Sequence, residues 1–364
     1  MPLVPPHVAS LQPYVPGKPI EEVEREYGVT DVAKLASNEN ALGPSPLALR
    51  AAREACSRIH LYPDGSAFLL KRALSARFSV PVEEILVGNG SNELIELIVR
   101  TFVLEGEEVL TSAKSFVAYK LAAHAHGRTL VEAPMKDVFH YDLDAIRARL
   151  TPRTKVVFLA NPDNPTGTWF LEGELLRFLG AVSPDTLVVL DEAYVEFVDA
   201  PGFQDALALR KRYPNLVILR TFSKIYGLAG LRLGYGVARA ELVGFIDRVR
   251  APFNTSLVAQ AAGLAALSDT GHVERTLALV RQERPRLEAG LLALGAVVAP
   301  SQGNFLLADF PGGNGKELFE LLLREGIVVR PVAGYGFPSA LRLTVGLPDE
   351  NARALAALAR VLAR

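Results

Sequence analysis

A lysine set among small and polar residues has the clearest chemical potential in this sequence. The segment Thr221-Phe-Ser-Lys-Ile-Tyr-Gly-Leu-Ala-Gly-Leu-Arg follows a short apolar run and brings Ser223, Lys224 and Arg232 together. A lysine in a partly dry cleft can have its pKa lowered, and a neutral amine attacks an aldehyde to form a Schiff base. The serine and the arginine could then bind a phosphate. Because lysines are mostly exposed, an isolated Ser-Lys pair would indicate only a surface residue.

Two further apolar runs lead directly into polar residues. Leu187-Val-Val-Leu precedes Asp191-Glu-Ala-Tyr194, and Val156-Val-Phe-Leu-Ala precedes Asn161-Pro-Asp-Asn164-Pro-Thr-Gly. A carboxylate keeps a pyridine nitrogen protonated, which makes the ring a better electron sink. A phenol and a rigidly mounted amide can hydrogen-bond a ring oxygen. Taken alone, Asp191 is more typical of a helix cap or a magnesium ligand, and Asn164 of a simple turn.

A glycine-rich turn and an aromatic residue complete the set. Val87-Gly-Asn-Gly-Ser91-Asn92 opens a helical pattern, and backbone N–H groups at a helix start, with Ser91 as the predicted cap, suit a phosphate. This is not the dinucleotide fingerprint, because the third glycine is missing and no P-loop lysine follows. Phe116, past the next apolar run, could stack on a flat heteroaromatic ring, although core packing is the commoner role of a single phenylalanine.

Short β-rich runs alternate with helical patterns between about residues 85 and 250. The runs are Ile85-Leu-Val, Val109-Leu-Thr, Thr129-Leu-Val, Val156-Val-Phe-Leu, Leu187-Val-Val-Leu and Leu216-Val-Ile-Leu. This alternation predicts an α/β fold whose mostly parallel central sheet is flanked by helices. Ligands of such sheets bind beyond the carboxyl ends of the strands, where the polar residues above are expected.

The rest of the chain predicts an arm and a smaller second unit. We expect residues 1–36 to form an N-terminal arm and part of a small domain, residues 37–255 a large ligand-binding domain, and residues 256–364 a small α+β domain. The arm is rich in proline, with a helical patch around Glu21–Tyr27. After residue 255 we expect one long helical stretch to Leu294, then two strands, a helix, two strands and a final helix from Asn351.

Composition excludes several classes of function. The formal net charge of -1 provides no sequence-wide basic field for nucleic acid or an anionic membrane. The single cysteine, Cys56, cannot form an internal disulfide, and residues 1–19 lack a basic opening and an apolar signal core, so we expect a cytoplasmic protein. The most apolar stretch, Ser256–Leu267, is too short to cross a bilayer. The histidines show no metal-ligand spacing with Cys56, so no metal is predicted.

Taken in order, these motifs resemble the fold type I enzymes that depend on pyridoxal 5′-phosphate (PLP), and more narrowly the class I and II aminotransferases. The resemblance implies that Lys224 binds PLP and moves protons, and that Asp191 pairs with the ring nitrogen. The remaining cofactor contacts that it implies are Phe116 stacking on the ring, Asn164 and Tyr194 at the ring oxygen, and Ser91, Asn92, Ser223 and Arg232 around the phosphate. Tyr62 resembles the tyrosine that reaches the phosphate from a neighbouring subunit, which implies a homodimer with shared sites.

Nearly end to end, the chain is most similar to the histidinol-phosphate aminotransferases. The supporting strings are Pro13-Tyr-Val-Pro-Gly-Lys, Leu35-Ala-Ser-Asn-Glu-Asn, Asp191-Glu-Ala-Tyr-Val-Glu-Phe, Val329-Arg and Leu341-Arg-Leu-Thr-Val-Gly. The resemblance implies that Arg330 and Arg342 bind the anionic end of the substrate, supplemented by Tyr14, Asn38 and Asn164. Two positions depart from the usual family pattern, with Asn92 in place of Asp and Phe116 in place of Tyr.

The implied reaction is a ping-pong transamination in histidine biosynthesis. It interconverts histidinol phosphate plus 2-oxoglutarate with imidazole-acetol phosphate plus glutamate. Because guanidinium groups bind either a phosphate or a carboxylate, an aromatic amino acid aminotransferase stays an alternative. A PLP-dependent decarboxylase of a phosphorylated, threonine-like substrate shares the scaffold and is a further alternative.

Overall fold

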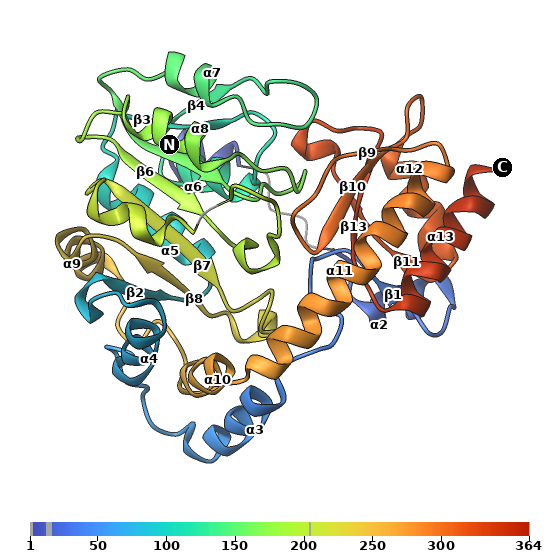
Figure 1. Ribbon diagram of the computed structural model, residues 1–364, viewed down its shortest axis with the longest axis horizontal. Coiled ribbons are helices and arrows are strands. Elements are labelled where there is room, and N and C mark those ends of the chain that lie inside the picture. Colours follow the sequence, from blue (N-terminus) through green and yellow to red (C-terminus); the bar gives the residue numbers. More distant parts are fainter. Residues whose placement is uncertain (1–2, 12–16, 204, 364) are drawn as a thin grey trace.

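A mixed sheet lies at the centre of the larger part of the molecule (Figure 1). The computed structural model describes residues 3–11, 17–203 and 205–363. Within these residues seven strands form the sheet, in the order β2-β8-β7-β6-β5-β3-β4. Their bounds are β2 Ile85–Gly88, β3 Glu108–Ser112, β4 Thr129–Ala133, β5 Thr154–Ala160, β6 Leu187–Asp191, β7 Leu216–Thr221 and β8 Gly234–Val237. Each of the six predicted runs is a strand, and the predicted α/β class is confirmed.

Helices cover both faces of this sheet, because its strands bury side chains in both directions. Alternate residues of β5 and β6 enter two separate hydrophobic cores, with Val157 in one and Phe158 in the other. The core around Phe158 includes residues of α5 (Ser91–Phe102), α6 (Val117–Ala125) and α9 (Ala240–Val249). The opposite core includes residues of α4 (Phe68–Phe78), α7 (Leu143–Ala148), α8 (Glu172–Leu179) and α10 (Leu257–Ser268). Burial on both faces explains why these strands read as continuous apolar runs.

One strand of this sheet was not predicted. β8 lies between β2 and β7 and is antiparallel to both. It contains Gly234 and Gly236 and so lacks the apolar run that marks its neighbours. A Cβ on Gly234 would lie 2.5 Å from the backbone nitrogen of Ser91. The strand therefore has no room for a side chain at Gly234, where the start of α5 approaches it.

A smaller antiparallel sheet, in the order β12-β13-β10-β9, lies beside the large one (Figure 1). Its strands are β9 Val297–Val298, β10 Phe305–Asp309, β12 Arg330–Pro331 and β13 Ala340–Thr344. Its core includes residues of α11 (Thr270–Ala293), α12 (Gly315–Arg324) and α13 (Pro348–Leu362). A separate parallel pair joins β1 (Ala33–Lys34) to β11 (Ile327–Val328), which attaches the chain at β1 to this part of the molecule.

The predicted elements of this part need three corrections. The long helical stretch is two helices, because Asp269 ends α10 and its side chain accepts the His272 N–H as the N-cap of α11. Three strands follow α12 rather than two. The final helix begins at Pro348 rather than Asn351, since proline fits the first helical turn without loss of a hydrogen bond.

The division into an arm, a large domain and a small domain stays a proposal. The pairing of β1 with β11 supports the first boundary, at residue 36. α10 packs closely against α3 (Pro46–Ala55) and against α4, on the side of the large sheet. This packing favours a second boundary after residue 268 rather than after residue 255.

Among the described residues, no helix combines the length and the apolar character that a membrane span needs.

Candidate active site

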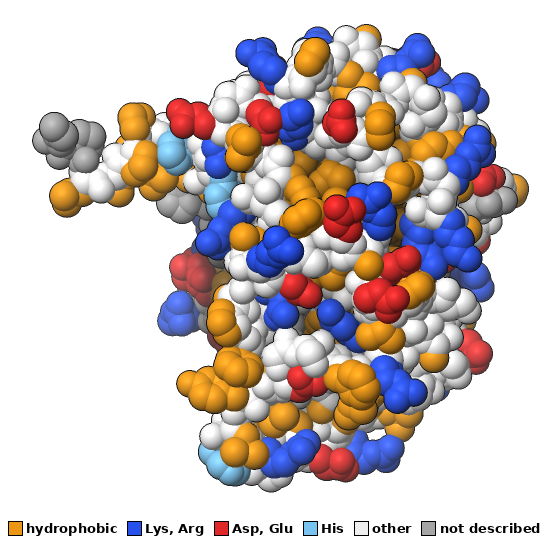
Figure 2. All heavy atoms as spheres, turned by 90° about the vertical axis from the view of Figure 1, so that its left-hand side faces the viewer, with side chains coloured by type: hydrophobic (Ala, Val, Ile, Leu, Met, Phe, Trp, Pro, Cys, Tyr) orange, Lys and Arg blue, Asp and Glu red, His pale blue; other side chains and the backbone are white. Residues whose placement is uncertain are grey.

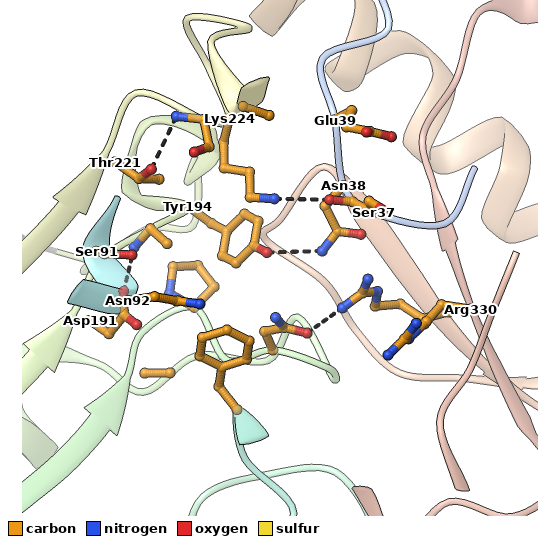
Figure 3. A pocket seen from close by; sticks show the side chains of 18 of the residues that line it. Ser37, Asn38, Glu39, Ser91, Asn92, Asp191, Tyr194, Thr221, Lys224 and Arg330 are labelled. Atoms are coloured by element: carbon orange, nitrogen blue, oxygen red, sulfur yellow. Dashed lines mark hydrogen bonds between the residues drawn. The ribbon is translucent and has the colours of Figure 1, made fainter. Parts of the chain in front are cut away.

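A cavity of about 270 Å³ opens where the carboxyl ends of β5, β6 and β7 face the small sheet. This is the position that the fold favours for a ligand. Its lining includes the following residues singled out by sequence: Asn38, Ser91, Asn92, Phe116, Asn164, Asp191, Tyr194, Ser223, Lys224, Arg232, Arg330 and Arg342. Residues that are spread over the sequence from Asn38 to Arg342 therefore meet around one cavity. Figure 3 shows Lys224 and Asp191 on one side of it and Arg330 on the other.

Lys224 follows β7 and points its amine into the cavity. Its Nζ donates a hydrogen bond to the Ser37 carbonyl oxygen at 2.9 Å and lies 5.7 Å from the centre of the Tyr194 ring. Burial, reinforced by the positive charge of Arg342, lowers the pKa of Lys224 to about 7. Near neutral pH a large fraction of this amine is therefore uncharged and nucleophilic.

Asp191 is the last residue of β6 and is almost completely buried. Burial raises the pKa of its carboxyl group to about 6. Two donors oppose this rise: the Tyr119 hydroxyl donates to Oδ2 at 2.9 Å and the Ala193 N–H donates to Oδ1 at 3.2 Å. Lys224 contributes a smaller favourable charge. The carboxylate can thus be ionised at neutral pH and face a cationic group.

Tyr194 and Asn38 meet on the upper side of the same cavity (Figure 3). The Asn38 amide donates to the Tyr194 hydroxyl at 2.9 Å, and Thr344 on β13 accepts the Asn38 N–H at 2.9 Å. Burial raises the pKa of Tyr194 to about 12, so its hydroxyl keeps its proton and can donate to a ligand oxygen. This contact links the loop after β1 to both sheets.

Asn164 and Arg342 connect the two walls of the cavity. Asn164 sits in the predicted rigid turn, where the carboxyl group of Asp163 accepts the Thr166 hydroxyl at 2.8 Å. Arg342 donates to the Asn164 Oδ1 at 2.5 Å and to the Ala36 carbonyl oxygen at 2.8 Å. The Asn164 amide is therefore aimed into the cavity by its turn and by an arginine from the small sheet.

Arg330 and Arg342 lie directly opposite each other on β12 and β13. Opposed residues of an antiparallel pair project from the same face of a sheet, so both guanidinium groups reach the cavity. Two permanent positive charges on one face suit a doubly charged anion such as a phosphate monoester.

The start of α5 forms a second anion site with Arg232. Ser91 is the first helical residue and Gly90 is the N-cap, so the prediction of Ser91 as the cap is wrong. Gly90 has φ 77°, and a Cβ there would lie 2.5 Å from Arg232 Nη2. The glycine therefore leaves the Arg232 guanidinium group and the N–H groups at the start of α5 accessible from the cavity. Ser223 lines the same cavity.

The residues present fit PLP on the chemistry of this donor set. The bare turn at Gly90 is a cradle that a side chain would fill, and it holds hydroxyl, amide and guanidinium donors for a phosphate. Lys224, Asp191 and Phe116 line the same cavity and match an aldehyde, a pyridinium nitrogen and a flat ring respectively.

Tyr62, predicted to reach the site of a neighbouring subunit, does not line the cavity of its own chain. Tyr62 is 83% exposed and stacks on Phe253, with ring centres 4.8 Å apart. Tyr14 lies outside the described residues. Sequence reasoning also missed the polar lining residues Ser37, Glu39, Tyr119, Thr221 and Tyr335. Ser37, Glu39 and Thr221 stood inside the quoted motifs, whereas nothing in the sequence distinguished Tyr119 on α6 from a core aromatic residue.

Comparisons with known proteins agree with this geometry. The model of the family described as aminotransferase class I and II matches residues 30–358. The solved histidinol-phosphate aminotransferase from Sinorhizobium meliloti, in complex with PLP, superimposes with a TM-score of 0.91 at 30% identity, covering 100% of this chain and 98% of that chain. The fold and the site therefore define a fold type I PLP-dependent transferase.

The sequences of relatives narrow this class. A histidinol-phosphate aminotransferase from an Anaeromyxobacter species is 77% identical over 362 residues, covering 100% of both chains. Histidinol-phosphate aminotransferase 2 from Pseudomonas fluorescens is 46% identical, covering 100% of this chain and 98% of the relative. The chain belongs to the class I and II aminotransferases and, within them, to the histidinol-phosphate aminotransferase family. It is a transaminase that depends on PLP.

Proposed function

We propose that the protein catalyses transamination between histidinol phosphate and 2-oxoglutarate, giving imidazole-acetol phosphate and glutamate in histidine biosynthesis. The observation that carries this proposal is the pairing of Arg330 and Arg342 across the cavity from Lys224 and Asp191. This arrangement gives a substrate with an amine at one end and a phosphate at the other a partner for each end. The names of the relatives support the same substrate.

Lys224 is proposed to carry the proton transfers. Bound PLP supplies an electron sink that stabilises negative charge on the reacting carbon of the substrate. The Lys224 amine would accept the proton from that carbon, because its lowered pKa keeps it partly neutral near pH 7. The hydrogen bond from Nζ to the Ser37 carbonyl oxygen holds the amine over the cavity between transfers.

Asp191, Asn164 and Tyr194 are proposed to orient and polarise the cofactor ring. An ionised Asp191 would keep the ring nitrogen protonated, and Asn164 and Tyr194 would donate to the ring oxygen. Phe116 would stack on one face of the ring. The phosphate would be held by Ser91, Asn92, Ser223 and Arg232, which all line the cavity.

The arginine pair is proposed to hold the phosphate of the substrate, with Asn38 and Asn164 beside it. Arg342 is buried and already ordered by two hydrogen bonds, so little side-chain entropy remains to be lost when an anion binds. The short Asn164 contact of Arg342 also ties substrate binding to the residue at the cofactor ring.

We also propose a homodimer in which Tyr62 reaches the PLP phosphate of the partner subunit. Exposed apolar side chains near Tyr62 support a covered surface, namely Ile59, Leu61, Phe68, Leu69 and Phe253. The amino-terminal segment with α1 (Pro6–Ala9) projects from the body of the molecule and carries further hydrophobic side chains (Figure 2).

A cytoplasmic location stays part of the proposal, supported by the single cysteine, Cys56, which is free and exposed.

An absorbance titration tests the substrate. The purified protein, loaded with PLP, is mixed with histidinol phosphate, phenylalanine, tyrosine or aspartate, and a Lys224→Ala variant runs in parallel. Conversion of the absorbance band to the pyridoxamine form by histidinol phosphate, and its absence in the variant, is the expected result. Faster conversion by an aromatic amino acid would reassign the substrate, and release of carbon dioxide would indicate a decarboxylase.

A further inference from the structure

Tyr119 is a buried residue of the cavity lining, and the functions described above give it no role. It lies on α6, and its side chain is fully inaccessible to solvent. Its hydroxyl donates to Asp191 Oδ2 at 2.9 Å. Burial raises the pKa of Tyr119 well above its usual value, so the hydroxyl keeps its proton at every physiological pH and remains a donor.

The ring of Tyr119 is fixed by two aromatic neighbours. It stacks on Phe158 of β5 with ring centres 4.7 Å apart and planes inclined by 3°. Its other contact is edge-to-face with Phe116, at 5.7 Å and 88°. One rigid side chain therefore touches both the carboxylate proposed to face the ring nitrogen and the phenylalanine proposed to stack on the ring.

The two oxygens of the Asp191 carboxylate have different hydrogen-bond donors. Oδ2 is occupied by Tyr119, while Oδ1 accepts only the longer bond from the Ala193 N–H among the described residues. The charged or titratable groups near the carboxyl group are Tyr119 on α6, Lys224 after β7 and Tyr194 after β6. Tyr119 is the one of these three that hydrogen-bonds the carboxylate, and a bond to the ionised form favours that form.

We propose that Tyr119 is a positioning residue that anchors Asp191 Oδ2, turns Oδ1 toward the cofactor ring nitrogen and keeps the carboxyl group ionised. The proposal rests on the proposed role of Asp191. It extends that role to a residue on α6, through which the packing of this helix against the sheet controls the electrostatics of the ring.

The test compares Tyr119→Phe with the wild type through the apparent dissociation constant of PLP, measured by equilibrium dialysis between pH 5.5 and 8.5. The substitution keeps both ring contacts and removes only the hydroxyl. Loss of a hydrogen bond to a charged group should weaken PLP binding roughly tenfold near pH 7. The acid-side fall in affinity should move to higher pH by roughly one unit, because the carboxyl pKa rises when its donor is lost.

Tyr235→Phe is the matched control, because Tyr235 is also a fully buried tyrosine but lies on β8 outside the cavity lining. It should leave the PLP affinity and its pH profile unchanged. Thermal unfolding of both variants without PLP reports any general loss of packing. A double-mutant cycle with Asp191→Asn isolates the contact, since Tyr119→Phe should cost less than about twofold once Asp191 is replaced.

The outcomes separate this inference from the proposed function. Unchanged PLP affinity in Asp191→Asn would remove the role of Asp191 and overturn both. Weaker binding in Asp191→Asn, together with a Tyr119→Phe profile that matches Tyr235→Phe, would overturn the role of Tyr119 alone. Equal losses from Tyr119→Phe with and without Asp191→Asn would show that the hydroxyl acts elsewhere, which also overturns it.

Discussion

The two walls of the active-site cavity differ in their charged groups, although the wall formed by the large sheet also carries the Arg232 guanidinium group. On the wall formed by the large sheet, burial moves the pKa of Lys224 down to about 7 and that of Asp191 up to about 6. On the wall formed by the small sheet, Arg330 and Arg342 provide guanidinium groups that keep their charge at any physiological pH. In the proposed mechanism, titratable groups therefore lie where protons move, and permanent charges lie where an anion is only held.

The two walls also differ in how their residues are fixed. Asp191 ends β6 and Lys224 follows β7, and both strands are buried on both faces, so the sheet itself places these residues. Arg342 lies within the buried strand β13 and is also held by a contact across the cavity, to Asn164 in the turn after β5. Substitutions on the wall formed by the large sheet should therefore abolish the catalytic step. Substitutions on the wall formed by the small sheet should weaken substrate binding and disturb Asn164.

The largest effect is expected for Lys224→Ala. Without the amine that moves the proton, kcat should fall by at least about 10⁴-fold, while the fold is retained. Steady-state transamination of histidinol phosphate measures the loss, and Lys211→Ala, at an exposed lysine, is the control. Turnover within tenfold of the wild type would place the chemistry on another residue.

Arg342→Ala and Arg330→Ala come next. Each should lower kcat/KM for histidinol phosphate by about 10²-fold, because a charged partner of the phosphate is lost. The loss at Arg342 should be the larger, since truncation also leaves the Asn164 side chain without its arginine donor. Arg330→Lys keeps the charge without the two-pronged geometry and should recover part of the loss. Wild-type values of kcat/KM in all three variants would contradict the separate role of the wall formed by the small sheet.

The wall formed by the large sheet should make the rate of PLP binding depend on pH. In the protein freed of PLP, the lowered pKa of Lys224 means that the neutral amine predominates above about pH 7. The rate at which PLP reacts with the free enzyme should rise several-fold from pH 6 to pH 8 and then level, after correction for the ionisation of PLP itself. Stopped-flow absorbance measures this rate. A rate still rising steeply at pH 9 would indicate an amine with an ordinary pKa.

Among these substitutions, the smallest effect is expected at Tyr62, which lies on neither wall of its own cavity. Tyr62→Ala should weaken PLP binding by about tenfold, the equivalent of one hydrogen bond to a charged group. Co-expression of Tyr62→Ala chains with Lys224→Ala chains should restore tight PLP binding at one site of each mixed dimer. That site would combine Lys224 of one chain with Tyr62 of the other. No recovery in mixed dimers would argue against shared sites.

Much of the large sheet and of its polar edge could be predicted from sequence. β5, β6 and β7 are buried on both faces, so their apolar runs are continuous, and the residues that follow them must lie at one edge of a parallel sheet. Asp191 and Lys224 were predictable for this reason. β8 was not, because its glycines carry no hydrophobic signal and their purpose is the close approach of α5.

The amino-acid sequence determined which chemical groups were available: a rigid amide, a carboxylate, an amine, hydroxyl groups and three arginines, spread over a long stretch of chain. Only the tertiary structure decided that Arg330 and Arg342 share one face, that Arg342 reaches Asn164, and that the Tyr119 hydroxyl meets Asp191. Local patterns encode periodicity and turns, but a contact between distant residues depends on strand register and helix packing. Burial then sets the pKa values, and burial exists only once the chain has folded.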